Sequence, residues 1–228
     1  MVSWIREKCP LVSVITRFIL LCALTFTSSS VIQDIQDMCR TGLATLAFFY
    51  FDFRDISKQD ARSLLSSLVI QLCRESDKYS EILSSRYSEH GNGTRQPSEE
   101  VLMECLKDML KVPKQGELYI VVVALDECPI FPGYPTPREQ VLAILRELVV
   151  LRLSHVHFCF TSRPEVDIRN VMEVLAVRNV SLHEQVGQKQ DISNYIESIF
   201  SSNRNIQRWR EEDKQFAKDK LSSGARGM

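Results

Sequence analysis

An apolar run that ends abruptly in two acids is the feature that most constrains the fold of this chain. Residues 119–125 are followed directly by Asp126 and Glu127, and a second apolar run, residues 157–160, leads into polar residues and Arg163. Continuous Val, Ile, Leu and Phe runs are typical of parallel strands covered by helices on both faces. Ligands of such sheets bind where the strands reach their carboxyl ends. The two runs therefore predict an α/β sheet whose edge displays acids and an arginine, as in phosphate and metal sites.

Helical and strand patterns alternate along the chain. Apolar residues recur with the helical period in several segments, and short apolar or aromatic runs separate those segments. The predicted helices are 28–39, 55–73, 77–87, 98–110, 138–151, 167–175 and 188–200, and the predicted strands are 43–53, 119–125, 157–163 and 177–182. This alternation over 228 residues predicts a three-layer, mainly parallel sheet with right-handed crossovers.

Charge and cysteine content narrow the functional classes. The net charge of −1 leaves no basic excess, so nucleic-acid binding is disfavoured. Seven cysteines make an odd number without a Cys-x-x-Cys pair, which predicts reduced core residues in a cytoplasmic protein. His155 and His157 alternate onto one strand face, but no third ligand is nearby in sequence, so a zinc site is disfavoured.

The first 27 residues are atypical for a domain of this kind. Residues 18–26 form an apolar stretch that is too short to span a membrane, so no stable membrane span is expected. This stretch resembles the core of a signal peptide, and the sequons at Asn92 and Asn179 would suit secretion. The odd number of cysteines and the lack of a clear cleavage site favour the cytoplasm instead.

The acids suggest nucleotide chemistry. A P-loop nucleoside triphosphatase needs a glycine-rich loop with a lysine, an acid for Mg²⁺, and a group that positions water. Asp126 is the candidate Mg²⁺ ligand, and Asp126 and Glu127 are the candidate catalytic acids. Arg163 is the candidate nucleotide-binding residue, either reading the γ-phosphate or pairing with one of the acids. The alternative is that two acids and an arginine only end their strands beside solvent.

Several segments together carry a resemblance to a known family. They are 124–129 (Ala-Leu-Asp-Glu-Cys-Pro), 161–165 (Thr-Ser-Arg-Pro-Glu), the tract 181–192, and the segments 48–52 and 58–60. In this order they resemble the NACHT domains of fungal signalling NTPases, including the nephrocystin-like N-terminal variant. The resemblance implies a STAND-class switch that uses ATP or GTP with Mg²⁺ in signal transduction. It also implies protein partners or self-association, and C-terminal repeat domains in full-length relatives.

This chain departs from the family pattern at two places. The family has an acid of the magnesium shell (Walker B) three residues before the position of Asp126, where this chain has Val123. In that alignment Asp126 and Glu127 match the distal acids, whereas the reading from the residues alone makes Asp126 the magnesium ligand. Secondly, the sequence contains no Gly-x-x-x-x-Gly-Lys-Ser/Thr loop (Walker A), and residues 18–24 occupy its expected place. Without that loop the amide cradle and the lysine charge are lost.

These observations lead to one main hypothesis with two alternatives. We expect an atypical N-terminal segment (1–27), a partial NACHT-like core (28–205) that lacks the Walker A strand and loop, and the start of a helical or winged-helix region (206–228). The expected function is a nucleotide-dependent signalling switch that is degenerate in nucleotide binding and hydrolysis, so enzyme activity stays open. A truncated or misassembled gene, or a decayed paralogue, would explain the unusual N-terminus. The alternatives are a non-catalytic protein-interaction scaffold and a secreted or membrane-anchored protein.

Overall fold

The computed structural model describes residues 2–6, 26–89, 96–112, 116–131, 135–176, 178–181, 194, 196–202 and 204–224. The chain divides into two compact units. The larger unit comprises residues 2–8 and 32–180, and the smaller comprises residues 9–31 and 181–228 together with Met1. The domain boundaries expected after residues 27 and 205 stay predictions. All candidate site residues belong to the larger unit, which is described first.

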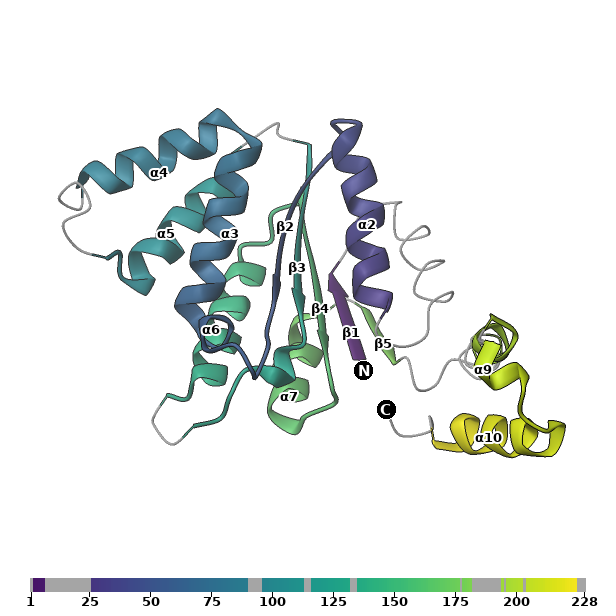
Figure 1. Ribbon diagram of the computed structural model, residues 1–228. Helices are drawn as coiled ribbons and strands as arrows, with labels where there is room; N and C mark the ends of the chain where they lie inside the picture. Colours follow the sequence, from purple (N-terminus) through teal and green to yellow (C-terminus); the bar gives the residue numbers. More distant parts are fainter. Residues whose placement is uncertain are drawn as a thin grey trace. The chain divides into compact units, whose positions relative to one another are not determined.

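The larger unit is built on a five-stranded sheet, and the sequence predicted most of its strands. The strands are β1 (Val2–Arg6), β2 (Ala44–Tyr50), β3 (Glu117–Val123), β4 (Val156–Ser162) and β5 (Arg178–Ser181). Their order across the sheet is β2-β3-β4-β1-β5. The central strands β2, β3 and β4 are parallel, with Phe48 level with Val121 and Val121 level with Cys159. The predicted α/β class with a mainly parallel sheet is confirmed (Figure 1).

Helices pack on both faces of the parallel strands. They are α2 (Phe26–Arg40), α3 (Ala61–Glu75), α5 (Glu99–Leu110), α6 (Pro137–Val150) and α7 (Val166–Leu175), while α4 (Asp77–Glu89) packs on α3 and α5. Figure 1 shows α3, α5 and α6 on one side of the strands and α2 on the other. The main core lies under α3, α5 and α6, where Leu68, Leu106 and Ile120 are completely buried. Burial of such residues is the dominant force that holds the layers together.

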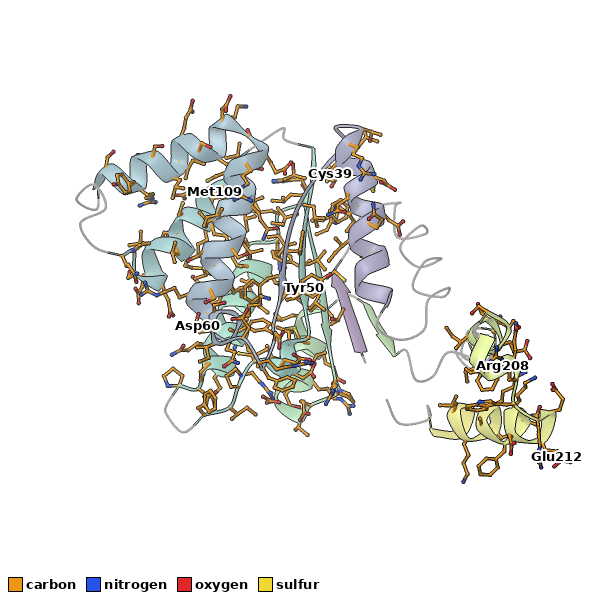
Figure 2. The ribbon with its side chains drawn as sticks, viewed as in Figure 1. Cys39, Tyr50, Asp60, Met109, Arg208 and Glu212 are labelled. Carbon is orange, nitrogen blue, oxygen red and sulfur yellow. The ribbon has the colours of Figure 1, made fainter. Side chains whose placement is uncertain are left out.

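Polar caps set the helix starts more sharply than the hydrophobic pattern does. Ser98 caps α5, because its side chain accepts a hydrogen bond from the Val101 N–H. The predicted helix 55–73 is two elements, because Asp55 caps a short 3₁₀ turn, η1 (Ile56–Lys58), and Asp60 then caps α3. Figure 2 labels Asp60 at this start of α3. Each cap contributes roughly 1 kcal/mol of helix stability.

The place between β4 and β5 is filled by a strand that the sequence did not suggest. The expected core lacks the Walker A strand, so another segment must lie beside β4. β1 lies there, antiparallel to β4, with Val2 level with Ser162 and Arg6 level with Phe158. The carboxyl end of β1 therefore lies away from the edge at which β2, β3 and β4 end. Residues 12–25 lie outside the described ranges.

The smaller unit contributes short helical segments. Residues 196–202 are helical, followed by α9 (Arg204–Gln207) and α10 (Glu211–Gly224). The ring of Phe200 contacts that of Trp209 edge-on, with centroids 6.4 Å apart, and the Lys218 ammonium lies 5.7 Å from the centroid of the Phe200 ring. Because residues 196–202 are helical, the predicted helix 188–200 is confirmed over residues 196–200. Within the described ranges, no helix combines the length and hydropathy that crossing a membrane requires.

The cysteines agree with the expectation of reduced residues wherever they are described. Cys39, Cys73, Cys105, Cys128 and Cys159 form no disulfide. Burial raises the pKa of the Cys105 thiol to about 11. A raised pKa keeps a thiol protonated and unreactive at neutral pH. Cys9 and Cys22 lie outside the described residues.

Candidate functional site at the carboxyl edge of the sheet

A strained turn at the end of β3 positions the two candidate acids. Ala124 adopts a left-handed conformation (φ 59°, ψ 50°), and the 3₁₀ turn η2 (Leu125–Glu127) follows it. For a residue with a Cβ, the left-handed conformation costs about 1–2 kcal/mol. The Ala124 N–H donates to Thr161 Oγ1 at 3.2 Å, and the Glu127 N–H donates to the Ala124 carbonyl at 2.9 Å. These bonds stabilise the turn and direct Asp126 and Glu127 away from each other.

Asp126 bridges the ends of two neighbouring strands. Its Oδ1 accepts the backbone N–H of Arg163 at 2.8 Å, and its Oδ2 lies 3.4 Å from Arg163 Nε. Only 8% of the Asp126 side chain is exposed, against 74% of the Arg163 side chain. The predicted adjacency of the two residues is confirmed. Of the two partners proposed for Arg163, phosphate or acid, the geometry supplies the acid.

A buried arginine that the sequence did not single out completes this edge. Arg138, with 7% of its side chain exposed, donates to the Asp126 carbonyl at 2.6 Å and to the Cys128 carbonyl at 2.9 Å. A third donor, Nη1, lies 3.3 Å from Asp167 Oδ2 in α7. The guanidinium thus joins η2 and the loop after it to α6 and α7. A planar fork of donors suits this task better than the single ammonium of a lysine.

The sequence did carry a signal for Arg138. Thr136 and Glu139 form a capping box at the start of α6, with hydrogen bonds of 2.8 and 3.2 Å. Arg138 therefore lies in the first helical turn, where the helix dipole disfavours a cation. A basic residue in that position suggests a compensating partner, and the acids of the preceding turn were the nearest candidates.

Glu127 points toward a different strand from Asp126. Its Oε2 accepts the backbone N–H of Phe53 at 3.3 Å, in the loop that follows β2. Asp126 is therefore tied to the β4 side of the edge and Glu127 to the β2 side. The catalytic, metal-binding and nucleotide-binding roles of Asp126, Glu127 and Arg163 stay predictions.

Two positions near these acids, 123 and 128, are buried and lack carboxylates. Val123, at the position where the family pattern has its first acid, is the last residue of β3 and is level with Tyr50 of β2. Its carbonyl accepts the Phe51 N–H at 3.1 Å. Cys128 Sγ lies 3.3 Å from the Gln59 carbonyl, and burial raises the pKa of this thiol to about 12. Nothing at either position supplies a negative charge at neutral pH.

The two histidines of the zinc alternative lie at the opposite edge of the sheet. His157 Nε2 is 2.6 Å from Glu117 Oε2, and the ring stacks on Tyr119 with centroids 4.8 Å apart. His155 Nε2 is 2.9 Å from the Leu110 carbonyl. Each imidazole thus serves a contact between elements. Across the part of the chain that the structure describes, no three His, Cys, Asp or Glu side chains gather closely enough to hold a metal ion.

Comparison with known proteins supports the NACHT-related resemblance at the level of a family. The sequence matches the family described as "Nephrocystin 3, N-terminal" over residues 20–163, which is more than half of its 228 residues. That range includes β2, β3, β4 and all three candidate site residues. Neither the curated proteins nor the solved structures yielded a match. On the family match, this chain belongs to the nephrocystin 3 N-terminal family.

Proposed function

We propose that this chain is a NACHT-type module of a STAND signalling protein whose nucleotide site is degenerate. The observation that carries the proposal is the state of Asp126, whose carboxylate is almost buried and is already paired with Arg163 through both oxygens. A carboxylate engaged in this way stabilises the end of the sheet. Its release for a ligand would leave the Arg163 N–H without its partner.

The residues present do not fit a complete site for Mg²⁺ with a nucleotide. Mg²⁺ takes hard oxygen ligands in octahedral geometry, commonly one or two carboxylates with waters and phosphate oxygens. Val123 offers none, and both oxygens of Asp126 have arginine partners. Glu127 accepts one hydrogen bond at 3.3 Å, from the Phe53 N–H, and is the acid with the weaker attachment to the protein.

The phosphate-binding half of the site has no counterpart either. The sequence lacks a Gly-x-x-x-x-Gly-Lys-Ser/Thr motif, so no lysine of that kind can neutralise a triphosphate. The strand beside β4, which is β1, directs its carboxyl end toward the edge away from Asp126. Support for degeneracy therefore comes from both halves of the expected site.

A second candidate function, a non-catalytic protein-interaction scaffold, is favoured by exposed apolar side chains. These side chains occur in the loops and turns that follow β2, β3 and β4, at the same edge as Asp126. They are Phe53, Ile56, Ile130, Phe131 and Val166, each at least 59% exposed. A contiguous patch of exposed apolar side chains is a common mark of protein interaction, and this candidate function requires these residues to form one. The expected partners are other protein domains or further copies of the chain.

The cytoplasm is the proposed location. The five described cysteines form no disulfide, and two of them, Cys105 and Cys128, are buried among apolar residues. Free thiols in such number suit a reducing compartment. Expression in cells followed by fractionation and a glycosidase test at Asn92 would check this, because a glycan on that residue would contradict it.

Calorimetric titration with Mg²⁺-ATP and Mg²⁺-GTP tests the proposed function. We expect no saturable binding by the wild-type chain and no hydrolysis above the buffer rate. Asp126→Ala and the exposed control Glu81→Ala should behave alike in this assay. Micromolar affinity that is lost in Asp126→Ala and kept in Glu81→Ala would contradict degeneracy and restore a working switch. Weak binding that changes the unfolding temperature would favour the switch over the scaffold.

A further inference from the structure

β1 is an inserted strand, because it separates β4 from β5 in the sheet order. Figure 1 shows β1 between these two strands. Its five residues pair antiparallel with β4, from Val2 opposite Ser162 to Arg6 opposite Phe158. β5 is the last strand in the order, and β1 is its neighbour there. Departure of β1 would therefore leave one edge of β4 and one edge of β5 unpaired.

The part of β4 that β1 covers lies in the interior of the larger unit. Phe158, Phe160, Thr161 and Ser162 are each level with a residue of β1, and each is at most 6% exposed. Buried backbone N–H and C=O groups need hydrogen-bond partners. The place between β4 and β5 therefore requires a strand, so any departure of β1 must be followed by its return or by the entry of an equivalent strand.

A long connection joins β1 to the rest of its unit. The larger unit comprises residues 2–8 and 32–180, and the intervening residues 9–31 are assigned to the smaller unit. Residues 7–25 separate β1 from α2, and nineteen residues span at most about 60 Å. That reach is roughly four times the radius of gyration, about 15 Å, of a domain of 150 residues. The covalent length thus permits β1 to reach the sheet of a second copy.

A second copy of the chain carries the same strand and the same place for it. Exchange between two copies therefore restores every β1–β4 pair that it breaks, which is why exchange of an identical element is a low-cost route to a dimer. An unrelated segment offers no such match. Because the strand pairs are the same in monomer and dimer, the balance between them depends on the connection and on protein concentration.

We propose that the place between β4 and β5 is a strand-exchange site, at which β1 of one copy enters the sheet of a second copy. The exchange is reciprocal, so each chain donates its own β1 and accepts that of its partner in a two-fold symmetric dimer. The inference deepens the scaffold candidate of the proposed function by naming a second copy as the partner. It does not depend on nucleotide binding, so the nucleotide titration and the test below fail separately.

The test places one half of a disulfide on each of two chains. Ile5 is level with Cys159, and level residues of an antiparallel pair have Cα atoms about 4.5–5.5 Å apart, which a disulfide can bridge. One full-length chain carries Ile5→Cys with Cys159→Ser, and the other is the isotopically labelled wild type. The two are mixed, equilibrated under reducing conditions and then oxidised with glutathione disulfide, which accepts the two electrons as the bridge forms. Peptide mapping by mass spectrometry identifies the bridges.

We expect a bridge from position 5 of one chain to position 159 of the other, because exchange brings these positions level. While the dimer is the minor species, mass action raises the bridged fraction about tenfold for each tenfold rise in concentration. The doubly substituted chain alone is the matched control, because it has no thiol at position 159, and it should give no such bridge. Absence of the bridge from a folded mixture at every concentration from micromolar to millimolar would overturn the proposal.

Two further mixtures keep the test decisive. If Ile5→Cys does not fold, Val2→Cys in one chain and Ser162→Cys in the other should give the same concentration-dependent bridge, because these residues are also level. Val121 is level with Cys159 in the pairing of β3 with β4, and β3 is an internal strand. Val121→Cys with Cys159→Ser, mixed with the wild type, should therefore give no bridge between chains. A bridge of equal yield there would show that exchange is not specific to β1 and would also overturn the proposal.

Discussion

Different residues stabilise the two ends of the parallel strands. At the amino edge, the chain enters β3 through Gly116 (φ 80°), where a Cβ would lie 3.1 Å from the Leu43 carbonyl, and His157 pairs with Glu117. At the carboxyl edge, the chain leaves β3 through Ala124 and a tight turn whose carbonyls point inward to Arg138. The entry uses a glycine and an imidazole, and the exit uses a strained alanine and a permanent cation.

This difference shows which interactions stabilise each end of the parallel strands. The exit turn exposes two carbonyls to the interior, so a buried donor with fixed geometry is required. The entry has no such turn, and 36% of the Glu117 side chain is exposed and can be rehydrated. We therefore expect substitutions at the carboxyl edge to lower the free energy of unfolding more than substitutions at the amino edge.

Substitution of Arg138 should give the largest effect. Arg138→Met keeps much of the side-chain volume but leaves two buried carbonyls and Asp167 without their donor. We expect the free energy of unfolding to fall by about 3 kcal/mol, in the range for breaking a buried charged network. Urea denaturation followed by circular dichroism measures this. The control is Arg146→Met, on the exposed face of the same helix, which should change stability by less than about 0.5 kcal/mol.

Removal of the Asp126 carboxylate should come second. Asp126→Ala leaves the Arg163 N–H without its acceptor and disconnects the ends of β3 and β4, for an expected loss of about 2 kcal/mol. Arg163→Ala keeps the backbone bond and removes only an exposed cation, so it should cost less than about 0.5 kcal/mol. Equal losses in the two variants would show that the exposed ion pair, rather than the backbone bond, stabilises this edge.

Alkaline pH tests the buried interior of the carboxyl edge. The pKa of Cys128 is raised from 9.0 to about 12 in the folded state, so the folded chain binds more protons than the unfolded chain between these values. Stability from this thiol is complete below pH 9 and is lost as the pH rises toward 12, by about 1.4 kcal/mol per pH unit. Urea denaturation of Cys128→Ala should show a shallower decline over that window. A decline as steep as that of the wild type would contradict the burial of this thiol.

The amino edge should give the smallest change. His157→Phe keeps an aromatic ring on Tyr119 and removes the contact with Glu117, which water can replace in part. We expect a loss of about 1 kcal/mol, typical of one hydrogen bond. Thermal unfolding at neutral pH is the measurement. A loss as large as that of Arg138→Met would remove the contrast between the two edges.

Much of the carboxyl edge was predictable because its parts are local in sequence. Asp126 and Arg163 each follow an apolar run, and parallel strands bring such positions together at one edge. The bonds from Asp126 to the Arg163 N–H and Nε confirm that inference. The capping residue Ser98 was predictable for the same reason, since a cap acts within one helical turn.

Other features could not be predicted because they join residues that are distant in sequence. Arg138 reaches Asp167 across 29 positions, and Gln71 reaches Phe48 across 23. The position of Arg138 in the first turn of α6 indicates that it needs a partner, but no spacing or periodicity identifies Asp167 as that partner, or Gln71 as the partner of Phe48. The division of the predicted helix 55–73 was also not predicted. Two nearby aspartates, Asp55 and Asp60, each cap a separate element there.

The sequence by itself determined the buried strands β3 and β4, most helices around them, and the absence of a Gly-x-x-x-x-Gly-Lys-Ser/Thr loop, because each is a local pattern of side chains. Only the tertiary structure decided that β1 fills the place beside β4 in the antiparallel direction. It alone also decided that Arg138 bonds to the Asp126 carbonyl and that the side chain of Gln71 pairs with the backbone of Phe48. Strand direction and partner choice depend on which surfaces and backbone groups remain unpaired after the rest of the chain has packed, and no local pattern encodes that.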